Sequence, residues 1–178
     1  LVVRHDADTA DGPLGERTLD QVRAALPEVP LLAEILDVCR DRLVNVEIKD
    51  PDPRVVDGLV ELLARRDPPD DVLVSSFDLV TIDRVRSLAP HLPTGFLSFG
   101  LDPNTALLLA FEHGHGAVHP DVWTLTTVDV GAFVVRAHDL GLQVNVWTVN
   151  DADQLSALRD AGVDAVITDD AGLYPVRS

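Results

Sequence analysis

The sequence is poor in several residue types. Its 178 residues include no methionine, one cysteine (Cys39), one lysine (Lys49) and only 4% aromatic residues. A single cysteine excludes an internal disulfide and a cysteine-rich metal cage. Basic residues are also scarce, because 14 Lys and Arg face 30 Asp and Glu for a formal net charge of −16. No cationic surface offsets repulsion by phosphate groups, so the charge argues against a nucleic-acid partner or an anionic lipid surface.

Long apolar runs are absent too. None approaches the roughly 20 residues that a membrane-spanning helix needs, so we expect no stable membrane insertion and a soluble, cytoplasmic chain. The length suits one domain with a substantial core, and we predict a single domain over residues 1–178. The first residue is Leu1 rather than methionine. We therefore do not expect it to be the translated start, and a signal peptide ahead of it stays open.

A repeating unit begins at residue 43. Short apolar, β-branched runs start 29, 22, 22, 27 and 22 residues apart, at Leu43–Ile48, Val72–Phe77, Thr94–Phe99, Gly116–His119, Gln143–Val149 and Ala165–Thr168. Continuous apolar runs of this kind are typical of parallel strands buried on both faces. Apolar stripes with helical spacing lie between most of them, over residues 55–63, 79–89, 130–140 and 151–161. The weakest helix is predicted at 105–112, where apolar residues are nearly continuous.

This alternation predicts an α/β fold with a parallel sheet and helical crossovers. Polar side chains follow nearly every predicted strand, which favours a (β/α)₈ TIM barrel over an open sheet with one switch point. Six β/α units lie in residues 43–178, whereas closure takes eight, so we expect about the first two strands to be missing from this chain. Residues 1–42 differ in kind: 1–6 resemble a strand end, 8–16 a polar loop, and 18–26 and 31–40 helices.

The Glu47-Ile48-Lys49 tripeptide is the sharpest local feature. Glu47 and Lys49 alternate with apolar neighbours, so both point to the same side of a strand, which in a barrel is the interior mouth. A glutamate there offers an oxygen ligand for Mg²⁺ or Ca²⁺, and a lysine offers a point charge for phosphate. An ion pair that only fills the end of the barrel is the alternative.

Three further residues are candidates for the same mouth. His5, beside Asp6, is either a general acid/base or a surface histidine. His119, before Pro120, is the best candidate among the histidines of residues 113–119, whose spacing matches no known zinc site. Trp147 either walls a substrate pocket with its indole plane or fills the core. No P-loop, dinucleotide glycine fingerprint or G-x-S-x-G elbow occurs.

Six stretches together resemble the glycerophosphodiester phosphodiesterase family of (β/α)₈ barrels. They are Val2–Asp6, Pro30–Leu36, Asn45–Lys49, Ser75–Phe77, Val146–Asn150 and Gly162–Asp169, in the family's order. The resemblance implies metal-dependent hydrolysis of a small-molecule glycerophosphodiester to glycerol 3-phosphate and an alcohol. It also implies that His5 is one of two catalytic histidines, that Glu47 is a ligand of Mg²⁺ or Ca²⁺ and that Lys49 binds the phosphate. Trp147 would line the pocket.

Two family motifs are absent from the sequence. It contains no His-Arg-Gly tripeptide, which carries the other catalytic histidine, and none of its six glutamates begins a Glu-x-Asp pair of metal ligands. Of the metal ligands that the family uses, Glu47 is therefore the only candidate in this sequence. We predict that the intact family member is a phosphodiesterase and that this chain is nearly inactive. Two alternatives remain: a non-catalytic barrel remnant acting as a binding or scaffold module, and an unrelated phosphate-binding β/α enzyme. The sequence gives no indication of the oligomeric state.

Overall fold

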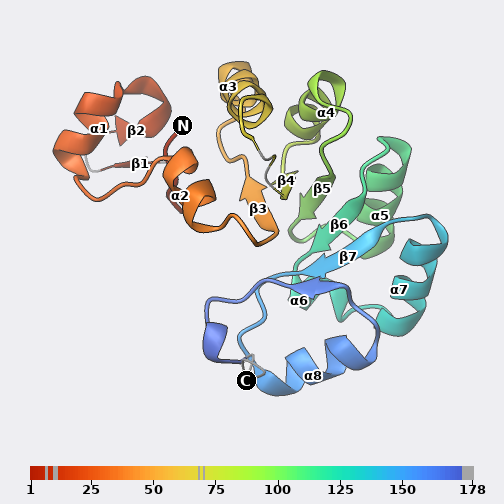
Figure 1. Ribbon diagram of the computed structural model, residues 1–178. Helices are drawn as coiled ribbons and strands as arrows, with labels where there is room; N and C mark the ends of the chain where they lie inside the picture. The colour runs from red at the N-terminus through yellow and green to blue at the C-terminus, as the bar shows by residue number, and fades with distance from the viewer. Residues whose placement is uncertain (7, 10–11, 68, 70, 174–178) are drawn as a thin grey trace. The chain divides into compact units, whose positions relative to one another are not determined.

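The structure is a computed structural model that describes residues 1–173 except 7, 10, 11, 68 and 70. The chain divides into two compact units, one of residues 1–76 and 80–92 and the other of residues 77–79 and 93–178. From β3 (Val44–Glu47) to β8 (Ala165–Val166), strands are separated by helices (Figure 1). Among the described residues, none of the helices has both the length and the apolar character needed to cross a bilayer.

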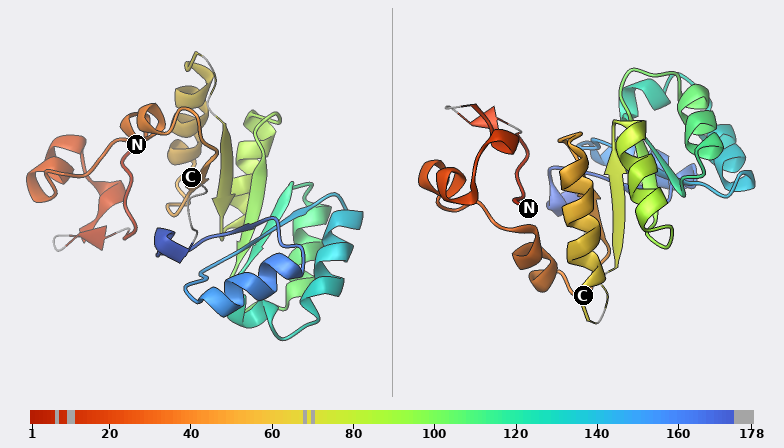
Figure 2. Two further views of the ribbon diagram at one scale, coloured as in Figure 1. Left: turned by 60° about the horizontal axis from the view of Figure 1, so that its bottom comes forward. Right: turned by 90° about the horizontal axis from the view of Figure 1, so that it is seen from above.

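The first unit holds one parallel strand pair and its covering helices. Its elements are β1 Asp8–Thr9, β2 Gly12–Pro13, the 3₁₀ helix η1 Leu14–Glu16, α1 Leu19–Ala25, α2 Leu32–Val38, β3 Val44–Glu47, α3 Pro53–Ala64, β4 Val72–Ser76 and α4 Leu79–Leu88. Strand β3 pairs in parallel with β4, with Val44 opposite Val72 and Glu47 opposite Ser75. One core cluster joins Leu36 of α2, Leu59 of α3 and Val85 of α4 to these strands. Helices α3 and α4 lie next to this strand pair (Figures 1 and 2).

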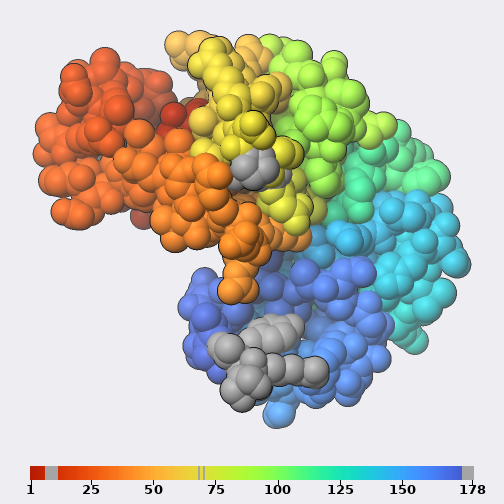
Figure 3. All heavy atoms as spheres, in the orientation of Figure 1, coloured from red at the N-terminus to blue at the C-terminus, as the bar shows by residue number. Residues whose placement is uncertain are grey.

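The second unit holds four parallel strands. Its elements are β5 Thr94–Ser98, α5 Pro103–Glu112, β6 Ala117–Pro120, α6 Val122–Leu125, α7 Val130–Asp139, β7 Gln143–Val146, α8 Ala152–Asp160, β8 Ala165–Val166 and η2 Ala171–Leu173. Strand β5 pairs with β6, β6 with β7 and β7 with β8, all in parallel. Helix α8 buries only Leu158 and lies at the surface of this unit (Figure 3).

The six predicted strands and the repeated helices are confirmed, and two local differences have physical reasons. Residues 1–6 form no strand of a parallel sheet: Val2 makes a single antiparallel bridge with Leu31, because Pro30 and Leu32 take up the backbone hydrogen bonds of Val3 and Leu1. Helix α6 was not predicted, since four residues are too few to show helical periodicity; Asp121 caps it by accepting from the Thr124 N–H at 2.9 Å.

The polar loop predicted at residues 8–16 contains a short antiparallel pair, β1 with β2, followed by η1. Residues 10 and 11 of this loop lie outside the described residues. Helix α5 begins two residues earlier than predicted, because Asp102 caps it and Pro103 occupies its first position.

Candidate active site

Glu47 and Lys49 form an ion pair at the carboxyl end of β3. Glu47 Oε2 lies 3.7 Å from Lys49 Nζ, and the two side chains are 29% and 33% exposed. Ile48 between them points the other way, into the core beneath α3, and is 4% exposed. The predicted alternation is therefore confirmed: both charged side chains share one side of the strand. This half-buried pair combines an oxygen ligand and a cation that could each contact a phosphate-bearing ligand.

His5 and Asp6 lie in the same unit, ahead of α1. His5 is 88% exposed, and its Nδ1 lies 2.9 Å from Asp6 Oδ1. The hydrogen bond from His5 and its charge lower the pKa of Asp6, and the charges of Arg4 and Lys49 lower it further. The fold thus brings the His-Asp dipeptide within electrostatic range of Lys49, which lies 43 positions after Asp6 in the sequence.

His119 of β6 lies in the interior of the second unit. Its side chain is 1% exposed, and Asn145 Nδ2 lies 3.0 Å from its Nε2. Nδ1 is buried and has no hydrogen-bond partner among the described residues. Burial lowers the pKa of His119 to about 4, so the ring is neutral at pH 7. His119 was one of the residues predicted at the barrel mouth. The structure places it in the buried packing beneath the strand ends.

Trp147 directly follows β7, and its side chain is hydrogen-bonded to β6. Its indole Nε1 donates to the His119 carbonyl oxygen at 2.8 Å. The indole N–H is thus used inside the protein, while the ring plane meets two phenylalanines. Phe77 packs edge-on at 5.3 Å between ring centroids, and Phe99 packs at a tilt of 41° and 6.0 Å.

The sequence reasoning missed Phe99 and Asp121. A signal for Phe99 was present: Ser76-Phe77 and Ser98-Phe99 repeat the same dipeptide at the ends of successive strands. Asp121 carried no such signal, because its importance lies in a partner 21 residues away, the Gly100 N–H that it accepts at 3.1 Å.

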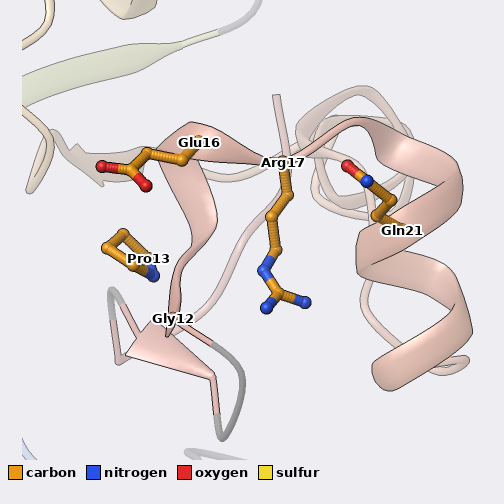
Figure 4. Close-up of a pocket in the computed structure, with 5 residues that line it drawn as sticks. All are labelled: Gly12, Pro13, Glu16, Arg17 and Gln21. Atoms are coloured by element: carbon orange, nitrogen blue, oxygen red, sulfur yellow. The ribbon is translucent and has the colours of Figure 1, made fainter.

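A separate pocket of about 360 Å³ lies in the first unit, beside the short β1–β2 pair (Figure 4). It is lined by Gly12, Pro13, Glu16, Arg17 and Gln21. None of the predicted site residues lines it.

Comparisons with known proteins identify the class, a phosphoric diester hydrolase of the α/β barrel type. Residues 1–173 match the model of the glycerophosphoryl diester phosphodiesterase family. A glycerophosphodiester phosphodiesterase from Caldanaerobacter subterraneus subsp. tengcongensis is 27% identical over 192 residues, which cover 96% of this chain and 76% of that protein. Three other curated relatives are spanned over 53%, 59% and 58% of their length.

Solved structures show the same fold. A glycerophosphodiester phosphodiesterase from Parabacteroides distasonis superposes with a TM-score of 0.78 at 22% identity, covering 94% of this chain and 73% of that one. A phosphodiesterase from Oleispira antarctica, solved in complex with the product sn-glycerol-3-phosphate, gives 0.76 at 20% identity, covering 94% and 75%. The predicted α/β barrel type is confirmed. The chain belongs to the glycerophosphoryl diester phosphodiesterase family, a family of hydrolases.

Proposed function

We propose that this chain carries the phosphate-binding part of a glycerophosphodiester phosphodiesterase. The observation that carries the proposal is the Glu47–Lys49 pair, half-buried on one side of a strand end in a chain of this family. Lys49 would neutralise the phosphate of the substrate, as a compact ammonium suits a point contact with anionic oxygen. The products would be glycerol 3-phosphate and an alcohol. Because one family model covers both compact units, we also propose that residues 1–178 constitute a single domain.

His5, Trp147 and His119 complete the proposed set. The exposed imidazole of His5 would exchange a proton with the oxygens of the ester, and Asp6 would orient it through their 2.9 Å hydrogen bond. Trp147 would bind substrate through its ring plane, since its N–H is already used. The buried ring of His119 would contribute indirectly, by supporting the backbone to which the Trp147 indole is hydrogen-bonded.

A divalent cation, Mg²⁺ or Ca²⁺, is the cofactor that the family resemblance implies, with Glu47 as its ligand. Glu47 by itself does not fit a tightly held ion. Among the described residues, Glu47 belongs to no cluster of three His, Cys, Asp or Glu ligands. One carboxylate, already paired with an ammonium, is too few for a cation that takes six or more oxygens. We therefore assign no step of the reaction to a metal.

We further propose that the chain is nearly inactive by itself. The sequence has no His-Arg-Gly and no Glu-x-Asp, so it offers one of the two family histidines and one of the family's metal-binding carboxylates. Loss of one general acid/base alone lowers a rate by about 10²–10⁴-fold. Hydrolysis of glycerophosphoglycerol with Mg²⁺ or Ca²⁺ should therefore be at least 100-fold slower than that of a complete family member, to order of magnitude. Turnover equal to that of the complete enzyme would contradict this.

Phosphate binding is tested separately from turnover. In a titration with glycerol 3-phosphate, Lys49→Met should weaken affinity by about tenfold or more, because a charge-assisted contact is lost. Lys49→Arg, which keeps the charge, should lose less. Arg65→Met is the matched control, since Arg65 pairs with Glu61 on α3, away from the strand ends. Equal affinity in Lys49→Met and the unsubstituted chain would favour an unrelated β/α protein, and no binding by either would favour the scaffold alternative.

A further inference from the structure

Two histidine rings lie side by side where α5 ends and β6 begins. Both residues, His113 and His115, belong to the second compact unit. Their ring centroids are 6.1 Å apart, and the two ring planes are 15° from parallel. One ring nitrogen of His113 lies within 4.8 Å of one ring nitrogen of His115. His113 is exposed and His115 is 5% exposed, so the pair joins a ring that solvent reaches to a ring that is held inside the protein.

The backbone that carries both rings is fixed by the end of the helix. The N–H of His113 donates to the Leu109 carbonyl at 3.0 Å, and the N–H of His115 donates to the Ala110 carbonyl at 2.9 Å. Gly114 between them has a φ of +74°, the left-handed conformation with which glycine commonly ends a helix. The spacing of the two rings is therefore set by the helix cap rather than by a free loop.

A buried hydroxyl orients the ring of His115. Thr94, the first residue of β5, is 2% exposed, and its Oγ1 lies 2.9 Å from His115 Nδ1. Metal-binding histidines are typically held in this way, because a hydrogen bond at one ring nitrogen fixes the tautomer and directs the other nitrogen at the ion. With Nδ1 engaged by Thr94, His115 would bind a metal through Nε2.

We propose that His113 and His115 together bind one Zn²⁺ ion. Imidazole nitrogen suits Zn²⁺ and its transition-metal neighbours, whereas Mg²⁺ and Ca²⁺ prefer oxygen ligands. Two nitrogens on one tetrahedral zinc ion lie about 3.3 Å apart, and the exposed side chain of His113 can rotate to close the difference. Water would fill the remaining positions of the ion. The net charge of −16 favours the approach of any cation to this surface.

The position of the pair indicates a stabilising ion rather than a catalytic one. The histidines precede the amino end of β6, whereas Trp147 follows the carboxyl end of β7, and these two strands are parallel. The pair and Trp147 therefore lie at opposite ends of the strands, and the amino ends of barrel strands serve stability rather than catalysis. Through His115 and Thr94, the ion would fasten the end of α5 to β5. The site shares no residue with the proposed phosphate site, so the two proposals stand or fall separately.

The test measures Zn²⁺ binding by competition with a chromophoric chelator. Cys39→Ser is the background, because the free thiol of Cys39 could bind zinc elsewhere in the chain. An excess of MgCl₂ occupies the exposed carboxylates. One Zn²⁺ per chain should bind and should not be displaced by the Mg²⁺, since the ligands are nitrogen atoms. His113→Asn, a change at an exposed position, should weaken zinc affinity about tenfold or more.

Two further positions separate this site from adventitious binding. His138→Asn is the matched control, because His138 is a histidine of the same unit that pairs with the Asp164 carboxylate at 2.9 Å and not with a second histidine. It should leave zinc affinity unchanged. Thr94→Val should weaken zinc binding about tenfold through the lost hydrogen bond to His115, whereas Thr94→Ser, which keeps the hydroxyl, should stay close to the unsubstituted chain. Thermal melts without zinc verify that each variant is folded.

Stability gives a second readout on the same samples. Zn²⁺ at about 100-fold over its Kd should raise Tm by about 5–10 °C, because the ion binds the native chain, and should not raise it in His113→Asn. Unchanged zinc affinity in His113→Asn, or an equal loss in His138→Asn, would overturn the proposal and indicate an adventitious ion only. Zinc binding that Mg²⁺ abolishes would overturn it as well, since carboxylates would then be the ligands.

Discussion

His119 illustrates at the scale of a single residue how burial determines charge. Its ring is 1% exposed and faces the Asn145 amide. Desolvation disfavours the imidazolium, which lowers the pKa to about 4 from an ordinary value of 6.5. In the unfolded chain the ring takes up a proton near pH 6.5, but in the native protein it does not until about pH 4. The unfolded state therefore binds more protons in this window, and stability falls as the pH falls.

The pH dependence gives the first prediction. Between pH 7 and pH 5, His119 should lower the free energy of unfolding by about 2 kcal/mol. Urea unfolding of the unsubstituted chain and of His119→Gln at both pH values measures this. The variant should lack this part of the loss, while the other histidines act equally in both proteins. Equal losses in the two proteins would show that the ring is protonated in the native state.

Single residues also show how far the site could be predicted. The alternation of charged and apolar residues was enough to place Glu47 and Lys49 on one side of β3, because the side-chain period of a strand is two. It could not show that His119 is enclosed, since enclosure depends on neighbours that are distant in sequence, Gly95 and Asn145. The roles assigned to His5, Glu47, Lys49, His119 and Trp147 stay predictions.

At the scale of elements, Gly95 of β5 packs against the ring of His119 of β6. A Cβ placed on Gly95 would lie 2.3 Å from His119 Nε2. Gly95→Ala should therefore force the ring or the strand to move and should lower the free energy of unfolding by about 1–3 kcal/mol, as measured by urea unfolding.

Two controls bracket this prediction. Gly116→Ala should have an effect within about 0.5 kcal/mol, because a Cβ there would meet only the Thr94 carbonyl at 3.8 Å. In a His119→Ala background, Gly95→Ala should cost less, since the obstructing ring is gone. An unchanged cost in that background would place the strain elsewhere.

Helix α5 depends on its amino-terminal cap. The Asp102 carboxylate accepts from the Thr105 N–H at 2.9 Å and from the Thr105 hydroxyl at 3.0 Å. Asp102→Ala should cost about 1 kcal/mol and lower Tm by about 2–4 °C, measured by a thermal circular-dichroism melt. Asp102→Asn, which can still accept both hydrogen bonds, should remain close to the unsubstituted chain. A melt of Asp102→Ala that is unchanged would mean that packing alone holds this apolar helix.

At the scale of the whole molecule, strand edges control association. Strand β3 hydrogen-bonds with β4 and with no other strand in the described ranges, and Leu43 just before it is 61% exposed. Unpaired backbone groups beside apolar side chains favour pairing with another chain. Leu43→Lys should therefore raise the concentration at which light scattering begins.

Val38→Lys provides the matched control for that experiment. Val38 is 86% exposed at the end of α2, belongs to no strand, and its substitution adds the same charge. Its scattering onset should stay near that of the unsubstituted chain. Equal rises in both variants would indicate that charge alone, and no strand edge, controls solubility.

The order of helices and strands and the parallel α/β class followed from the sequence by itself, because hydrophobic periodicity and capping residues act between near neighbours in the chain. The resemblance to the family was also visible in the sequence, because six short motifs occur in the family's order. Only the tertiary structure decided that Phe77, Phe99 and Trp147 form one cluster, that Asp121 lies buried beside it and that His119 is neutral. These properties arise from contacts between strands some 20 to 70 residues apart, whose register and burial are set by packing rather than by local pattern.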